Sequence, residues 1–163
     1  MANFQAVLAL TAPLFLLVLF GYALGAWARW PKGVADALTV YVVESNAKLQ
    51  DAFRDKFKKL GFRVLMSTDA DQAIKRYQTQ PYHALIIDVG TAGNDGVDAY
   101  RRVLKEAEMM NLDIAGVLIL NEDQKAWGAS VLNLAGGKVF VRPVTMKQLS
   151  DALAERLPEM IAE

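Results

Sequence analysis

The first 28 residues of this 163-residue chain contain no charged side chain, and no other feature constrains the fold as strongly. Within them, Ala6–Ala28 is a nearly unbroken apolar run. A helix of that length spans about 34 Å, enough to cross a bilayer core of roughly 30 Å, and lipid favours a helix because its backbone satisfies its own hydrogen bonds. The sequence therefore predicts one transmembrane helix in residues 1–30, a linker at 31–38 and a separate domain at 39–163.

The flanks of the apolar run predict its orientation. Tyr22, Trp27 and Trp30 gather toward its C-terminal end, where aromatic rings favour the membrane interface. Arg29 and Lys32 lie at the same end, and no basic residue precedes the run, so the positive-inside rule places the domain in the cytoplasm. We expect a single-pass protein of the inner or plasma membrane, bound to the membrane through residues 6–28. A signal peptide, a buried core helix and an artificial junction are the alternatives.

Composition excludes several classes of site. The chain has no cysteine, which excludes disulfides, thiolate metal sites and cysteine nucleophiles. Its one histidine, His83, leaves little room for a catalytic triad or a histidine metal site. Basic and acidic side chains balance at 18 each, so bulk charge predicts neither a nucleic-acid nor an acidic-lipid partner.

Short apolar runs recur through the second part of the chain. Such runs are typical of parallel strands that are covered on both faces. The runs are Val40–Val43, Ala84–Ile87, Val117–Leu120 and Val139–Val141, with Phe62–Met66 as a weaker candidate nearer an edge.

Amphipathic segments lie between these runs. Apolar side chains at helical spacing predict helices over Leu49–Leu60, Val97–Ala107 and Met146–Leu157. Gly61 is expected to end the first helix, and a capping box of Thr145 and Gln148 to open the last. Five strands that alternate with five helices predict a doubly wound α/β domain.

Polar side chains follow the predicted strands at the point where each strand ends. In a doubly wound sheet these ends meet at one edge, where ligands bind. Carboxylates there could hold Mg²⁺, and a cation could neutralise a phosphoryl group. The residues are Glu44, Ser45, Asp88, Asn121, Arg142 and Pro143.

A glycine-rich segment, Gly90–Gly96, follows the third predicted strand. It lacks the Gly-Lys-Ser/Thr sequence of a P-loop. We therefore expect a flexible turn here rather than a phosphate cradle.

Four of these stretches together resemble the response-regulator receiver family over residues 39–157. They are VYVVESNAKL from Val40, LIIDVGTAGNDGV from Leu85, VLILN from Val117 and VFVRPV from Val139. The resemblance implies a flavodoxin-like five-stranded parallel sheet of order 2-1-3-4-5 and a role in two-component signalling. It also implies a cis peptide bond between Arg142 and Pro143.

The resemblance assigns roles position by position. Asp88 matches the phospho-accepting aspartate and Glu44 the first residue of the family's acidic pair. Ser45 stands where the second acid, a direct Mg²⁺ ligand, belongs. Asn121 replaces a threonine or serine, and Arg142 replaces a lysine.

These departures predict a degenerate site and a pseudo-receiver that acts by protein–protein interaction. Loss of one acid lowers the expected Mg²⁺ affinity, so we expect no cofactor and no enzymatic activity. We expect Asp88 to cap a helix or pair with Arg142, and the partner to be a signalling protein or a second copy of the chain. In the alternative interpretation, Asp88 accepts phosphate from a histidine kinase, with Mg²⁺ held by Glu44 and Asp88.

A second resemblance concerns the N-terminal segment. Leu10–Leu38 is similar to the first transmembrane helix of auxin-efflux-carrier-type permeases. A single helix of that kind cannot form a transport path, so the resemblance implies an anchor rather than transport.

Overall fold

Residues 38–157 are the part of the chain that the computed structural model describes. The predicted transmembrane segment 6–28 and the linker lie outside the described residues, except for Leu38 at the end of the linker. None of the helices in 38–157 is both long and apolar enough to cross a membrane.

The strands form one parallel sheet in the order β2-β1-β3-β4-β5, as the resemblance implied. The weak candidate at Phe62–Met66 is confirmed as β2, which lies at one edge of the sheet. The strands are β1 (Thr39–Val43), β2 (Arg63–Ser67), β3 (Ala84–Asp88), β4 (Ala115–Leu120) and β5 (Gly137–Val141).

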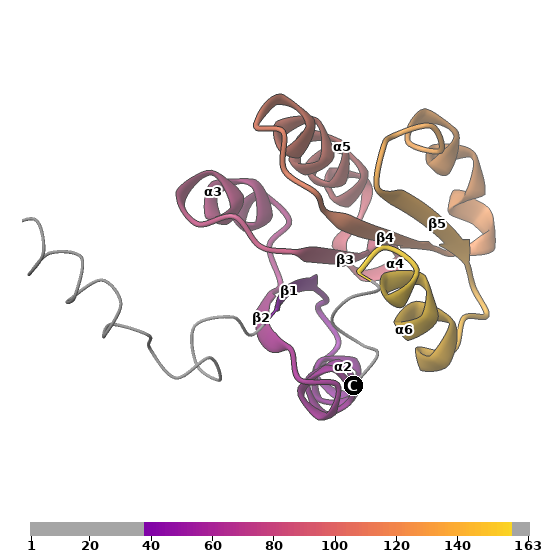
Figure 1. Ribbon diagram of the computed structural model, residues 1–163. Coiled ribbons are helices and arrows are strands. Elements are labelled where there is room, and N and C mark those ends of the chain that lie inside the picture. The colour runs from indigo at the N-terminus through magenta and orange to yellow at the C-terminus, as the bar shows by residue number, and fades with distance from the viewer. Residues whose placement is uncertain (1–37, 158–163) are drawn as a thin grey trace, which may run out of the picture. The chain divides into compact units, whose positions relative to one another are not determined.

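Helices connect the strands and cover both faces of the sheet, with α2 and α6 on one face and α3 and α5 on the other (Figure 1). Their bounds are α2 (Ala47–Lys59), α3 (Asp71–Thr79), α4 (Val89–Ala92), α5 (Asn94–Met109), the 3₁₀ helix η1 (Glu122–Ser130) and α6 (Met146–Ala154). Because the strands are apolar on both sides, alternate residues of each strand enter two separate cores. Val40 and Val42 pack in the core under α2 and α6, and Tyr41 and Val43 in the core under α3 and α5.

The local signals for helix ends are confirmed at α2 and α6. Asn46 caps α2 by accepting hydrogen bonds from the N–H groups of Lys48 and Leu49. Gly61, with φ of +84°, lies just beyond the end of α2 in a conformation that favours glycine. Thr145 and Gln148 form the predicted capping box at the start of α6.

The prediction of a flexible turn at Gly90–Gly96 is wrong. Val89–Ala92 forms α4, and α5 begins at Asn94, so Gly93 alone, with φ of +71°, separates two helices. Side-chain capping decided this, because the Asp88 carboxylate accepts a hydrogen bond from the N–H of Gly90. The segment after β4 forms a 3₁₀ helix rather than an α-helix.

Candidate functional site

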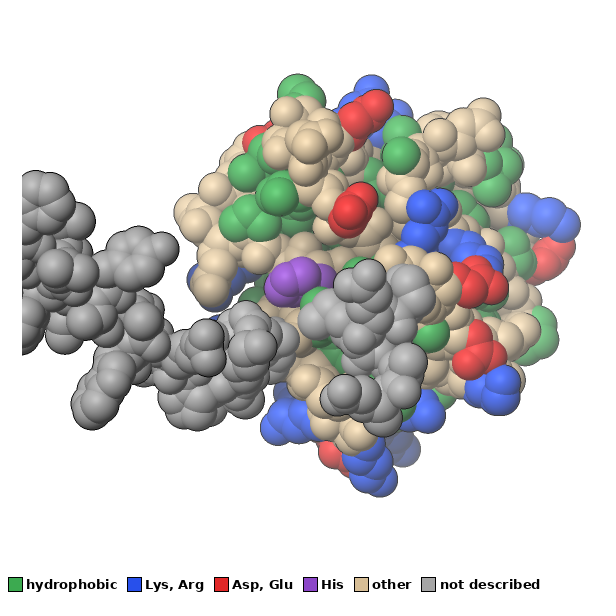
Figure 2. Space-filling view, in the orientation of Figure 1, with side chains coloured by type: hydrophobic (Ala, Val, Ile, Leu, Met, Phe, Trp, Pro, Cys, Tyr) green, Lys and Arg blue, Asp and Glu red, His purple; other side chains and the backbone are tan. Residues whose placement is uncertain are grey.

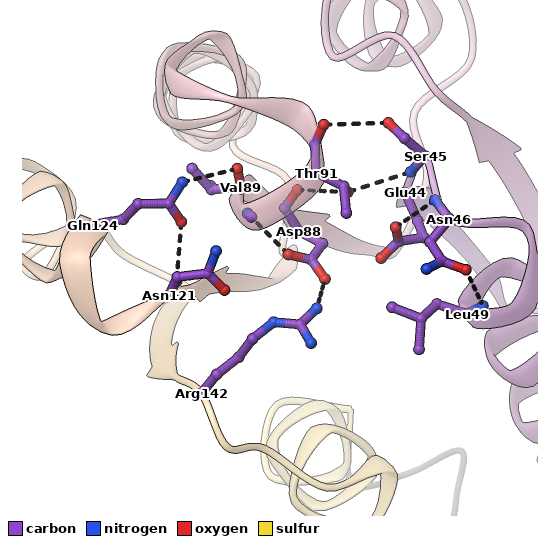
Figure 3. Close-up of polar contacts among 11 residues, drawn as sticks. Glu44, Ser45, Asn46, Leu49, Asp88, Val89, Thr91, Asn121, Gln124 and Arg142 are labelled. Carbon is purple, nitrogen blue, oxygen red and sulfur yellow. Dashed lines mark hydrogen bonds and ion pairs between the residues drawn. The ribbon is translucent and has the colours of Figure 1, made fainter.

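The carboxyl ends of the strands bring the predicted polar residues to one edge of the sheet (Figure 3). Glu44 and Ser45 follow β1, Asp88 ends β3, Asn121 follows β4 and Arg142 follows β5. The Arg142–Pro143 peptide bond is cis, as the resemblance implied. Pro143 fixes the backbone beside Arg142, and no polar contact of its own joins it to the site.

Asp88 is fully buried and both of its carboxylate oxygens have partners. Oδ1 accepts a hydrogen bond of 3.0 Å from the N–H of Gly90 at the start of α4. Oδ2 forms an ion pair with Nη2 of Arg142, whose side chain is 37% exposed. The carboxylate therefore both caps a helix and pairs with arginine, the two roles we expected as alternatives.

Glu44 is fully buried beside Asp88 (Figure 3). Its Oε1 accepts a hydrogen bond of 2.7 Å from the N–H of Asn46, whereas Oε2 has no hydrogen-bond partner among residues 38–157. Burial raises the pKa of the Glu44 carboxyl above its ordinary value. The Asn46 N–H opposes this rise in pKa, and the neighbouring Asp88 carboxyl adds to it.

Ser45 does not face Asp88 as a metal ligand would; it binds Thr91 of α4 instead. The Ser45 N–H donates to Thr91 Oγ1, and the Ser45 hydroxyl donates to the Thr91 carbonyl, both at 3.3 Å. The Thr91 hydroxyl in turn donates to the Asp88 carbonyl at 3.2 Å. Sequence reasoning missed Thr91; the available signal was a hydroxyl three residues after a strand-ending aspartate, a spacing that permits a bond back to the main chain.

Gln124 is a second residue that sequence reasoning missed. Its side chain is nearly buried, with Oε1 accepting from the N–H of Asn121 at 3.0 Å and Nε2 donating to the Val89 carbonyl at 3.3 Å. The first bond caps η1, and the second joins η1 to α4 beside Asp88 (Figure 3). Glutamine three residues after an N-terminal asparagine is a capping signal, and it could have identified this contact.

Gly90 lies between Asn121 and Asp88 with no room for a side chain. A Cβ at this position would lie 2.9 Å from Oδ1 of Asn121 and 3.0 Å from Oδ1 of Asp88. The Asn121 side chain thus packs against the α4 backbone beside the carboxylate.

No protein-family model matches the sequence. The chain is 26% identical over 99 residues to the sensory/regulatory protein RpfC of Xanthomonas campestris pv. campestris, which aligns 60% of this chain but 14% of that protein. It is 22% identical over 121 residues to the probable chemotaxis protein CheY of Rhizobium etli, covering 74% of this chain and 92% of that protein.

Solved structures show the same fold. The receiver domain of the sensor histidine kinase PA1611 from Pseudomonas aeruginosa, with a magnesium ion in its active-site cleft, matches 76% of this chain and 99% of its own. Its TM-score is 0.61 at 20% identity. A chain from the Saccharomyces cerevisiae complex of Ypd1 with the receiver domain of Ssk1 matches 78% of this chain and 94% of its own, with a TM-score of 0.61 at 16% identity.

The chain spans a small part of the RpfC protein and nearly the whole length of the CheY protein. Residues 38–157 therefore have the same fold as these receiver domains.

Proposed function

We propose that this chain is a pseudo-receiver: a receiver-type module of two-component signalling that acts by protein–protein interaction, without a phosphorylation cycle. The ion pair between Arg142 and Asp88 carries the proposal. In it, the guanidinium takes the place beside the carboxylate that a metal ion or phosphoryl group would need. Arginine suits this role because it keeps its charge and presents several N–H donors to one carboxylate.

The donor set does not fit Mg²⁺. A magnesium site needs oxygen ligands in near-octahedral positions and usually includes one or two free carboxylates. Here Arg142 and Gly90 occupy the Asp88 oxygens, and Ser45 binds Thr91. No group of three or more His, Asp or Glu side chains in residues 38–157 is arranged to hold a metal.

A module without a phosphorylation cycle passes on a signal through the surface that it presents to a partner. The 3₁₀ helix η1 and the short α4 both contact the residues around Asp88, through Gln124 and Thr91. A signalling protein or a second copy of the chain that binds beside η1 and α4 would recognise a single, fixed arrangement of these two helices. The complex of Ypd1 with the Ssk1 receiver domain supports a partner protein, because a chain of similar fold occurs there.

We further propose that residues 6–28 hold the domain at a membrane, with residues 39–163 on the cytoplasmic side. The support is the uncharged apolar run followed by Arg29 and Lys32.

A magnesium titration followed by NMR tests the pseudo-receiver. We expect no saturable shifts at the Asp88 and Glu44 amides at low millimolar Mg²⁺, about 1 to 5 mM. The matched variant Ser45→Asp/Arg142→Lys restores the second acid and frees Asp88, so we expect it to bind Mg²⁺. Saturable shifts below about 1 mM in the unaltered chain would favour a phosphorylatable receiver instead.

A further inference from the structure

The amino ends of the strands form the edge of the sheet opposite the candidate site, and the chain enters the domain there. Leu38 directly precedes β1, and its carbonyl accepts a hydrogen bond of 2.7 Å from the N–H of Arg63 at the start of β2. On the other side of β1, the N–H of Thr39 donates to Nδ1 of His83, just before β3, at 3.1 Å. Whatever precedes Leu38 therefore joins the domain between the starts of β2 and β3.

The part of this edge beneath β2, β1 and β3 carries positive charge. The stretch from Lys56 to Arg63 contains four basic side chains and no acidic one, and the turn before β3, residues 79–83, has no carboxylate. Lys58, Lys59 and Arg63 are exposed. No carboxylate within residues 38–157 forms a salt bridge with these three side chains or with Lys56. In Figure 2 several basic side chains, with an acidic one among them, lie at the lower edge of the domain, where Figure 1 places α2.

Exposed apolar side chains lie at the same edge, beneath β4. Helix α5 returns to the amino end of β4, and the residues at this turn, Met109, Met110 and Leu112, are 74%, 43% and 42% exposed. They are three of the five large apolar side chains exposed within residues 38–157, so exposed apolar surface concentrates here. Glu108 and Asp113 flank them, and Arg156 lines the same pocket as Leu112.

We propose that this edge docks on a bilayer surface that carries anionic phospholipid headgroups. We call it the basic–apolar edge; it comprises Lys56, Lys58, Lys59, Arg63, Met109, Met110 and Leu112. Basic side chains are attracted to an anionic leaflet, and apolar side chains beside them enter the headgroup region. An acidic protein would account for the basic residues but gives no role to the exposed methionines.

The inference rests on the proposed anchor in one respect, because the anchor holds the edge close to lipid. The eight residues 31–38 span at most about 28 Å when fully extended. Leu38 lies at the basic–apolar edge, so an anchor that precedes Leu38 would tether this edge rather than the candidate site. Docking would leave the Asp88 edge facing away from the bilayer and open to a partner.

A fluorescent probe on the full chain tests the docking. The chain has no cysteine, so Gln80→Cys places one label on the exposed turn before β3, and Ala126→Cys places a control label on η1 at the opposite edge. Both proteins are reconstituted in nanodiscs of phosphatidylcholine, or of equal parts phosphatidylcholine and phosphatidylserine. We expect spin-labelled headgroups to quench the label at position 80 in the phosphatidylserine discs, and added salt to reverse the quenching.

Charge variants test which basic side chains contribute to docking. Lys58→Gln/Lys59→Gln/Arg63→Gln should lower the equilibrium ratio of docked to undocked domain by about fivefold per residue. Lys48→Gln/Lys125→Gln/Lys147→Gln removes the same charge at the opposite edge and should leave docking unchanged. Equal effects of the two triple variants, or equal quenching in both kinds of disc, would overturn the proposal.

Two further outcomes distinguish lipid docking from the membrane anchor and from binding to an acidic protein. If the chain fails to sediment with neutral vesicles, the anchor is wrong; salt-reversible binding to phosphatidylserine vesicles would then still support the basic–apolar edge. Binding of the edge to soluble polyglutamate, without binding to phosphatidylserine discs, would assign it to an acidic protein and overturn the lipid proposal.

Discussion

Arg142 and Asp88 form an ion pair between residues 54 positions apart, across the carboxyl ends of β3 and β5, with β4 between them. Asp88 is fully buried, and the guanidinium reaches it from a partly exposed position. Burying a carboxylate costs free energy unless a cation or hydrogen-bond donors compensate its charge, so the arginine stabilises the buried Asp88. The same pair removes the negative charge that would attract a metal ion.

Arg142→Met should therefore destabilise the domain. We expect the free energy of unfolding to fall by about 2 kcal/mol, below the range for a fully buried pair because water reaches Arg142. Urea denaturation measures the change. The control Arg101→Met breaks an exposed pair with Asp98 and should change it by less than about 0.5 kcal/mol. Adding Asp88→Asn to Arg142→Met should recover part of the loss; no recovery would show that the arginine acts through packing.

Glu44 should give the domain a distinctive pH dependence. Because its pKa is raised in the folded state, the folded chain binds this proton more tightly than the unfolded chain does. The resulting stabilisation is present below the ordinary glutamate pKa and is lost as the pH rises through the folded-state value. Glu44→Gln should remove this loss and raise the free energy of unfolding at neutral pH by about 1 kcal/mol, the scale of one added hydrogen bond.

The comparison for this effect is Glu108→Gln on the exposed surface, which should leave the pH profile unchanged. Denaturation across the acid-to-neutral range gives both curves. A Glu44→Gln variant whose profile matches that of the unaltered chain would contradict the assignment.

Asp88 should resist chemical phosphorylation. Acetyl phosphate with Mg²⁺ is expected to leave its mass unchanged, because Arg142 occupies one carboxylate oxygen and the Gly90 N–H the other. Intact-mass spectrometry checks this, with Asp88→Asn as the blank and Ser45→Asp/Arg142→Lys as the variant expected to gain a phosphoryl group. A base-labile phosphoryl adduct on Asp88 of the unaltered chain would favour the phosphorylatable receiver.

Gln124→Ala should loosen α4 without unfolding the domain. The substitution removes the bond to the Val89 carbonyl, which joins η1 to α4, and the capping bond from the Asn121 N–H, at a cost of about 1 to 2 kcal/mol. We expect faster hydrogen exchange at the amides of residues 89–92 than the change in global stability explains. Gln78→Ala, on the exposed surface of α3, is the matched control and should leave the exchange rates of these amides unchanged.

The anchor makes a prediction for the whole chain. Residues 6–28 should hold it in membranes through washes with high salt or carbonate, so that its release requires detergent. Fractionation of cells that express the full chain, beside a chain starting at residue 38, measures this. A full chain that stays soluble and monomeric without detergent would exclude the transmembrane helix.

Several features of the domain could be predicted from the sequence because they depend on near neighbours. Apolar runs such as Val40–Val43 predicted parallel strands, and stripes at helical spacing predicted α2, α5 and α6. Parallel topology then placed Glu44, Asp88 and their companions at one edge, because the carboxyl ends of parallel strands meet there. Local signals also predicted the capping of α6.

Tertiary contacts decided the rest. The sequence could not show that Ser45 binds Thr91 or that Gln124 joins η1 to α4. Each contact joins two segments that follow different strands and lie far apart in the sequence. Helix α4 was missed for the same reason: two glycines in Gly90–Gly93 favour a turn until Asp88 caps the segment and Asn121 packs against it. The sequence by itself determined which charges reach the edge of the sheet, and the tertiary structure decided which of them pair, since pairing depends on distances that only the assembled sheet sets.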